Sequence, residues 1–201
     1  FGSLIGVIRT LPSKPLRLVG MAYVELFHNV PLLVQMFIWF YVLPELVGED
    51  LGRWMKRDMP FPEATSAILC LGTYTASRVA EQVRAGIESI PIGQSMAGYA
   101  MGLTTTQVYR YLLIPVGYRI IVPPMTSEFL TIFKNSSLAL TIGVAEVLYQ
   151  TRQIENYTFQ GFEAFTAATI IYLVLTMIVV VIMDRVEGRA RIPGYGVQGK
   201  T

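Results

Sequence analysis

The chain has 201 residues, of which 53% are hydrophobic and only 15% are charged, and its mean hydropathy is +0.49. This composition is too apolar for an ordinary soluble domain of this size and indicates a membrane protein. The net charge of +2 comes without a basic patch interleaved with aromatic residues, which excludes nucleic acid as a partner.

The chain opens on an apolar stretch, Phe1 to Ile8, that is too short to cross a membrane. We interpret this stretch as the tail of a helix whose start is absent, and we therefore expect an N-terminal truncation. It is not a signal peptide, because it lacks a charged region before the apolar run.

Four longer apolar segments follow, and the last of them carries no charged residue. About 20 such residues suffice to cross the hydrocarbon core of a bilayer. We therefore predict an all-α, polytopic membrane helix bundle that forms a single domain over residues 1–201. The expected spans are Leu26 to Pro44, Ala64 to Val83, Ile120 to Leu140, and Ala164 to Met183.

Three of these spans are interrupted. Pro31 lies in the first, Arg78 and Glu81 lie in the second, and Glu128 and Lys134 lie in the third. Charges inside spans are costly and indicate a bundle with a polar interior. Glu81, one turn from Arg78, is the expected partner of that arginine. The alternative is that Arg78 binds a carboxylate of a substrate.

The flanking charges alternate in sign at every crossing. The region before the first span is basic, the loop from Glu45 to Glu63 is acidic, and the loop from Arg84 to Arg119 is basic. The loop from Glu146 to Glu163 is acidic again, and the tail from Asp184, with Arg191 and Lys200, is basic. The positive-inside rule then places the 84–119 loop and the C-terminus in the cytoplasm.

The cytoplasmic loop contains the most informative stretch of the chain, Met96 to Pro115, read MAGYAMGLTTTQVYRYLLIP. We predict two short helices broken at Gly102. Thr104 and Gln107 can form a capping box that starts the second helix, and Pro115 marks its expected end.

This stretch resembles the ATPase-docking loop of ABC importer permeases, in which E-A-A is followed at fixed spacing by Gly and by Ile-x-Leu-Pro. Ala97, Gly102 and Pro115 match the pattern. Leu112 and Ile114 are conservative replacements, and Met96 and Gly98 depart from it. The resemblance implies that residues 92–115 dock a cytoplasmic ATPase.

Three further stretches resemble polar amino acid permeases and occur in the order of that family. They are Tyr23 to Gln35, Ala80 to Gln94, and Pro123 to Leu138. In the second stretch, Glu81, Arg84 and Glu88 are spaced to pair along one helix face, and a stabilised helix end is the simplest interpretation.

In the third stretch, two prolines are expected to open a helix with a polar lane. Glu128, Thr131 and Asn135 fall on one face, and Lys134 and Ser137 lie on a neighbouring stripe. Ser136 is also a residue of the expected path. A polar lane in a membrane helix is typical of a translocation path. Hydrogen bonding between helices is the alternative.

Together the resemblances identify the chain as a permease subunit of a bacterial ABC-type polar amino acid importer, most similar to glutamate/aspartate permeases. They imply a type I permease core of about five spans, with the first largely missing here. They also imply a multi-pass protein of the inner membrane with four kinds of partner, namely an ATPase dimer, a second homologous or identical permease subunit, a periplasmic amino acid-binding protein and the lipid bilayer.

The same resemblance implies a substrate site at mid-membrane that includes Arg78, Lys134, Asn135 and Ser136. No P-loop motif is present, so we expect the partner ATPase to hydrolyse ATP with Mg²⁺ while this chain binds no cofactor and is not an enzyme.

Other functions remain alternatives. The nearest is a permease of the same class for neutral or basic amino acids. A membrane-embedded enzyme would need catalytic residues such as paired aspartates within its spans, and this chain has none there. Its only histidine, His28, lies near a membrane surface. An ion-coupled carrier would require an internal repeat that we do not find. One histidine and the single Cys70 offer no metal site.

Overall fold

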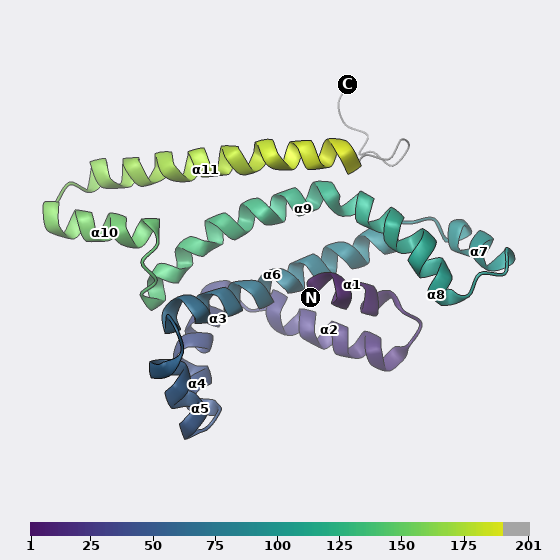
Figure 1. Cartoon of the computed structure of the whole chain (residues 1–201), viewed down its shortest axis with the longest axis horizontal. Helices are drawn as coiled ribbons and strands as arrows, with labels where there is room; N and C mark the ends of the chain where they lie inside the picture. The colour runs from purple at the N-terminus through teal and green to yellow at the C-terminus, as the bar shows by residue number, and fades with distance from the viewer. Residues whose placement is uncertain (191–201) are drawn as a thin grey trace. The chain divides into compact units, whose positions relative to one another are not determined.

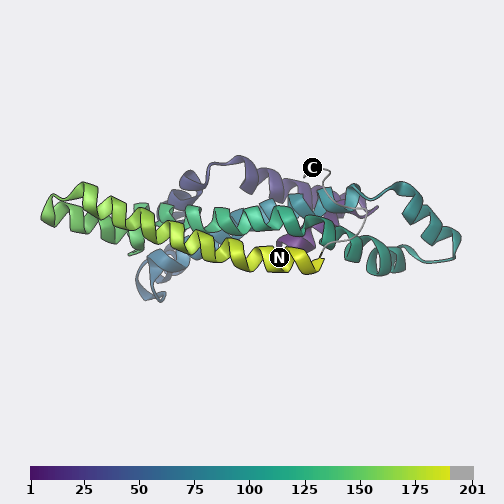
Figure 2. The ribbon, with the colours of Figure 1, turned by 90° about the horizontal axis from the view of Figure 1, so that it is seen from above.

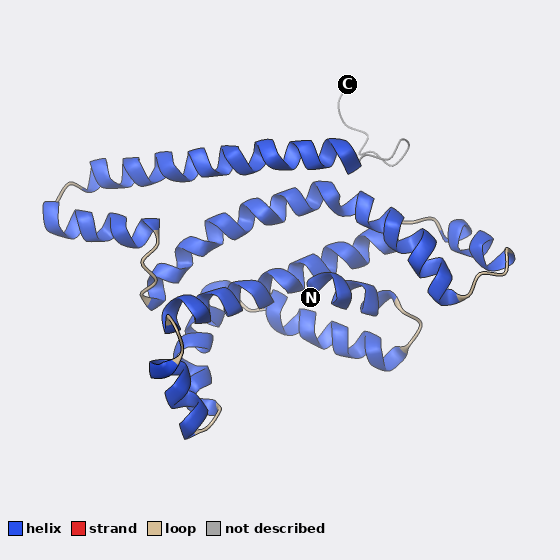
Figure 3. Ribbon diagram, in the orientation of Figure 1, coloured by secondary structure: helices blue, strands red, loops and turns tan. Residues whose placement is uncertain are grey.

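The computed structural model describes residues 1–190, and every regular element within that range is helical (Figures 1 and 3). The expected all-α class is confirmed. The α-helices are α1 (Gly2–Thr10), α2 (Lys14–Asn29), α3 (Leu32–Phe37), α4 (Leu43–Leu46), α5 (Glu49–Arg53), α6 (Pro62–Glu88), α7 (Ile92–Ala100), α8 (Thr105–Val108), α9 (Ile114–Ser136), α10 (Val147–Thr158) and α11 (Gly161–Ala190). Three π-helical turns, Ile38–Val42, Trp54–Asp58 and Tyr109–Leu113, and a 3-10 turn, Ser137–Ile142, continue or join them. Arg191 and Lys200 of the basic tail lie outside the described residues.

Two compact units make up the chain, and four helices (α2, α6, α9 and α11) run from one unit into the other. The first unit comprises Phe1–Leu26, Ala76–Glu128 and the chain from Val181 onward. The second comprises Phe27–Thr75 and Phe129–Val180. Each unit is described by itself.

Close helix packing characterises the first unit. A Cβ added to Gly6 of α1 would lie 2.6 Å from the Val83 Cβ of α6. A Cβ added to Gly86 of α6 would lie 2.3 Å from the Ile121 Cγ2 of α9. Because glycine has no side chain, the helix backbones approach closely at these two positions, as is common between membrane helices. The buried apolar residues of this unit include Ile5, Val24, Ala80, Val83, Ile87 and Ile121.

The second unit has its own apolar core, in which Met36 and Cys70 are fully buried. Cys70 therefore packs as a small apolar residue. The core of this unit consists of Leu32, Met36, Ala67, Cys70, Ala139 and Ile142.

The expected span from Leu26 to Pro44 is not one helix. Pro31 is the N-cap of α3, with φ −55° and ψ 134°, so α2 ends before it. Proline disfavours a helical conformation in the residue before it, which explains the break. The Gln35 Nε2 donates to the carbonyl oxygens of Phe27 (2.7 Å) and Val30 (2.8 Å). A side-chain amide thus satisfies backbone acceptors that the break leaves without helical partners.

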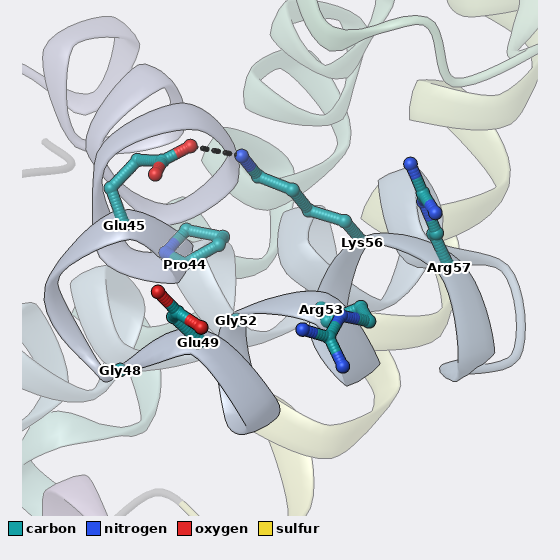
Figure 4. A pocket seen from close by; sticks show the side chains of 8 residues that line it. All are labelled: Pro44, Glu45, Gly48, Glu49, Gly52, Arg53, Lys56 and Arg57. Atoms are coloured by element: carbon teal, nitrogen blue, oxygen red, sulfur yellow. Dashed lines mark hydrogen bonds and ion pairs between the residues drawn. The ribbon is translucent and has the colours of Figure 1, made fainter.

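The acidic loop that precedes α6 is folded rather than irregular. Helices α4 and α5 form a hairpin that turns at Gly48, which has φ +94°. The two helices are close at Gly52, where an added Cβ would lie only 2.0 Å from the carbonyl oxygen of Pro44. An ion pair between Lys56 and Glu45 closes the far side of this hairpin, as Figure 4 shows. Both glycines are therefore required by the local backbone.

Among the described residues, one helix is long and apolar enough by itself to cross a membrane, Gly161–Arg189 of α11. The α2 helix and the Leu32–Leu46 segment meet the same standard only together, as a bent pair. Helix α6 contains the second expected span, whereas α9 contains the third only as far as Ser136, because its end lies in the 3-10 turn; neither helix meets the standard by itself. Both carry charged side chains within those spans, so the count of four spans stays a prediction.

Pro123 and Pro124 lie inside α9 rather than at its start, contrary to the expectation that they open the helix. The helix begins at Ile114 because the docking segment leads into it without a break in helical structure. Interior prolines are tolerated in membrane helices, where other groups can satisfy the carbonyls that they leave unbonded.

Candidate functional site

The loop between α6 and α9 has the two-helix form that its sequence predicts (Figures 1 and 2). Helix α7 ends in a Schellman motif, because Gly102 adopts φ +81°, its N–H donates to the Tyr99 carbonyl (2.9 Å), and the Leu103 N–H donates to the Gly98 carbonyl (3.1 Å). The Thr104 side chain and Gln107 then form the expected capping box at the start of α8. The turn is thus held by the Schellman motif at the end of α7 and by the capping box at the start of α8.

Gly98, which departs from the family pattern, has a packing reason. A Cβ at this position would lie 3.1 Å from the Cγ2 of Val108, whose side chain is fully buried against α7. The absence of a side chain lets α7 and α8 approach closely.

Several large apolar side chains of α7 and its C-terminal end face outward. Ile92 is 71% exposed, Met96 is 59% exposed and Met101 is 73% exposed, and Ala97 beside them is also exposed. Exposed apolar groups that cluster on an ordered polar-flanked loop are typical of an interaction surface.

The expectation that Pro115 ends the second helix is wrong. The segment continues through the π-helical turn Tyr109–Leu113 into α9, where Pro115 is the second residue. Proline has no N–H and its ring crowds the preceding turn, and the wider π-helical turn directly before it accommodates both effects. Leu112 and Ile114 are half-buried, whereas Pro115 is exposed.

Arg78 pairs with Glu128 and not with Glu81, so the expected pairing is wrong. The Arg78 Nε donates to Glu128 Oε2 at 2.7 Å and the Arg78 Nη2 donates to Oε1 at 2.9 Å. The Glu128 side chain is 5% exposed and that of Arg78 is 31% exposed. This bidentate geometry is the strongest form of an arginine–carboxylate contact. It links α6 to α9 and neutralises both charges.

Glu81 is held by two other arginines. Arg84, on the same helix, binds both Glu81 and Glu88, as their spacing predicts. Arg9 of α1 donates from Nη1 to Glu81 Oε2 at 2.5 Å. The end of α6 is therefore tied to α1 by a cluster of alternating charges.

The polar residues of α9 beyond Glu128 belong to the second unit. Lys134 is exposed, and Thr131 and Asn135 are half-buried. The hydroxyls of Ser136 and Ser137 donate to the carbonyls three residues before them, each at 2.7 Å. Ser136 therefore bonds within α9, and Ser137, the first residue of the 3-10 turn, bonds back to the end of α9.

No group of three or more His, Cys, Asp or Glu side chains within residues 1–190 is arranged to hold a metal ion. His28 lies in the last turn of α2.

Two residues of the site escape sequence reasoning. Arg9 is paired with a residue 72 positions away, and the Tyr109 hydroxyl donates to the carbonyl of Thr10, 99 positions away, at 2.5 Å. The only signal in the sequence is an arginine at the end of an apolar helix, which any membrane boundary also explains.

An ordered interhelical turn and charges paired between helices are features that membrane transport components share. The chain matches the family described as "Binding-protein-dependent transport system inner membrane component" over residues 1–192, and it belongs to that family. It is therefore the permease type of subunit, a multi-pass protein of the inner membrane, and not an enzyme.

Its relatives and structural neighbours agree with this assignment. The chain is 47% identical to the glutamate/aspartate import permease protein GltJ of Escherichia coli K12, over 96% of this chain and 79% of that protein. It is 31% identical to the probable glutamine ABC transporter permease protein GlnM of Bacillus subtilis, over 88% and 76%. A crystal structure of an amino acid ABC transporter with histidines matches with a TM-score of 0.78 at 29% identity, over 94% and 83%.

Proposed function

We propose that the chain is the permease subunit of an ATP-driven importer of acidic amino acids, glutamate or aspartate. The observation that carries this proposal is the 47% identity to a glutamate/aspartate permease along nearly the whole chain. Two such subunits, identical or homologous, enclose the path, a soluble binding protein delivers the substrate, and an ATPase dimer supplies the energy.

The ATPase docks on the α7–α8 turn. The exposed residues Ile92, Met96 and Met101 supply an apolar surface, and the Schellman motif with its capping box keeps that surface rigid. Met96, Ala97, Gly98, Gly102, Leu112, Ile114 and Pro115 form or support this dock. The loop then lies in the cytoplasm, on the side that its flanking basic charges favour.

Co-purification with the cognate ATPase tests the dock. A Cβ at Gly102 meets no neighbouring atom within 4 Å, but any side chain is strained at φ +81°, so Gly102→Arg should distort the turn and release the ATPase. Gly102→Asn, which tolerates this conformation, should retain it. Gly188→Arg, at an exposed helical position, controls for the added charge. Retention of the ATPase by Gly102→Arg would refute this dock.

The substrate path follows the polar residues of α6 and α9. Arg78 is the candidate cation for the additional carboxylate of an acidic amino acid, with Thr131, Lys134, Asn135, Ser136 and Ser137 along the path. Because Glu128 already binds Arg78, a substrate carboxylate competes with that of Glu128 for the guanidinium.

A charge exchange separates a substrate role from a structural one. The double variant Arg78→Glu with Glu128→Arg keeps an ion pair between α6 and α9, so the fold should be retained. If Arg78 recognises the substrate, uptake of glutamate should fall at least about tenfold, because the cation now projects from the other helix. Unchanged glutamate uptake and selectivity would remove Arg78 from the site.

Glutamine is the main rival substrate, since one relative is described as a probable glutamine permease. Competition settles the matter. Unlabelled aspartate should suppress uptake of labelled glutamate by the assembled importer, and unlabelled glutamine should not. The reverse order would favour a permease for neutral amino acids.

A further inference from the structure

The docking segment is anchored to the N-terminal helix by one side chain. Tyr109 opens the π-helical turn directly after α8, and its hydroxyl donates to the carbonyl oxygen of Thr10 at 2.5 Å. Thr10 is the last residue of α1, so this carbonyl is one of the acceptors that a helix end leaves unbonded. The bond is therefore specific in position and direction.

The residue before Thr10 continues the connection to α6. Arg9 donates to Glu81, and the Arg9 side chain is only 11% exposed. Its aliphatic part lies against α2, where a Cβ added to Gly20 would come within 2.6 Å of the Arg9 Cγ. Packing and charge together hold Arg9 in one orientation, so α1 and α6 are coupled at this point.

Arg9 has a hydrogen-bonding capacity that this conformation does not use. Its Nε is buried and has no acceptor among the described residues, although the guanidinium can contact a carboxylate through two N–H groups at once. Buried donors are nearly always bonded, and an exception marks strain or a functional constraint. The buried donor therefore marks Arg9 as a constrained residue at the contact between α1 and α6.

We infer that Tyr109, Arg9 and Glu81 form a joint that carries displacement of the docking turn into α6, and that Tyr109 and Arg9 are positioning residues for coupling ATP hydrolysis to transport. The inference rests on the proposed ATPase dock. The displacement passes through two contacts. The Tyr109 hydrogen bond connects the docking turn to Thr10 of α1, and the ion pair of the adjacent Arg9 connects α1 to Glu81 of α6. Glu81 lies one turn from Arg78, so the movement reaches the helix that carries the candidate substrate cation.

Tyr109→Phe tests the joint, because it removes one hydroxyl and keeps the ring. The complete importer, with ATPase, second subunit and binding protein, is reconstituted in proteoliposomes. The variant should retain the ATPase, but substrate transported per ATP hydrolysed should fall about fivefold, the factor that corresponds to one net hydrogen bond. Tyr118→Phe is the matched control, since its exposed hydroxyl makes no hydrogen bond within residues 1–190. A coupling ratio within twofold of wild type for Tyr109→Phe would overturn the inference.

Arg9 offers a second, independent variant. Arg9→Gln should lower the coupling ratio without loss of the ATPase, and Arg9→Lys, which keeps the charge that pairs with Glu81, should restore it at least in part. An unchanged coupling ratio in Arg9→Gln, no recovery with Arg9→Lys, or loss of ATPase binding in either Tyr109→Phe or Arg9→Gln would also overturn the inference. Failure of the proposed dock can be distinguished from failure of this inference, because in the first case Gly102→Arg would retain the ATPase.

Discussion

Breaking the Arg78–Glu128 pair should destabilise the first unit strongly. In Arg78→Met the Glu128 carboxylate, 5% exposed, is left without its bidentate partner. Removing one member of a buried pair costs about 3–5 kcal/mol. The lower end applies here, about 3 kcal/mol, because Arg78 is 31% exposed and partly hydrated. The free energy of unfolding of the purified subunit in detergent, from denaturant titration, measures this loss.

The partner variants give the reasoning its sharpest test. Glu128→Gln should cost only about 1–2 kcal/mol, since the remaining arginine reaches water. The double variant Arg78→Met with Glu128→Gln should then cost less than the sum of the single changes, by about 2 kcal/mol. Arg119→Met, at an exposed arginine with no ion pair in the described part of the chain, should change stability by less than about 0.5 kcal/mol. Additive single changes would show that the two side chains do not interact and would refute the pairing.

Three further changes have effects that follow from local geometry. Gly52→Ala should destabilise the α4–α5 hairpin by about 1–3 kcal/mol, because the new Cβ meets the Pro44 carbonyl oxygen at 2.0 Å, whereas Gly72→Ala, in open space, should not destabilise; thermal unfolding compares them. Thr104→Ala removes the capping box and should cost about 1 kcal/mol, seen as faster hydrogen exchange in α8, and unchanged exchange would contradict the cap. Gln35→Leu leaves two carbonyls unbonded at the break before α3 and should cost about 1–3 kcal/mol by denaturant titration, with a neutral result arguing against that role.

Features that depend on neighbours in the sequence were predictable. The Gly102 break, the capping box of Thr104 and Gln107, and the contacts of Arg84 with Glu81 all involve residues at most five positions apart. Helical geometry alone fixes such distances. The same local reasoning gave Arg78 the wrong partner, because Glu81 is near in sequence whereas Glu128 is 50 residues away. The register in which α6 packs against α9 decides that contact, and rules for residues near in sequence do not predict this register.

The prolines mark a second limit of sequence reasoning. Pro31 divides an expected span, Pro115 does not end its helix, and Pro123 and Pro124 lie within one. Each outcome depends on whether other groups compensate for the missing N–H or the disturbed turn. Gln35 and the π-helical turn before Pro115 provide this in two cases, and neither arrangement has a recognisable sequence pattern.

The 50-residue separation of Arg78 and Glu128 also bears on how the chain enters the bilayer during synthesis. At about 5–20 residues per second, a ribosome makes the carboxylate roughly 3–10 s after the arginine. During that interval α6 carries an uncompensated cation, which opposes its release from the insertion machinery into lipid. Retention of α6 there until α9 arrives would keep this cation out of lipid, whereas α11, synthesised after α9, can partition into the membrane by its own apolar character.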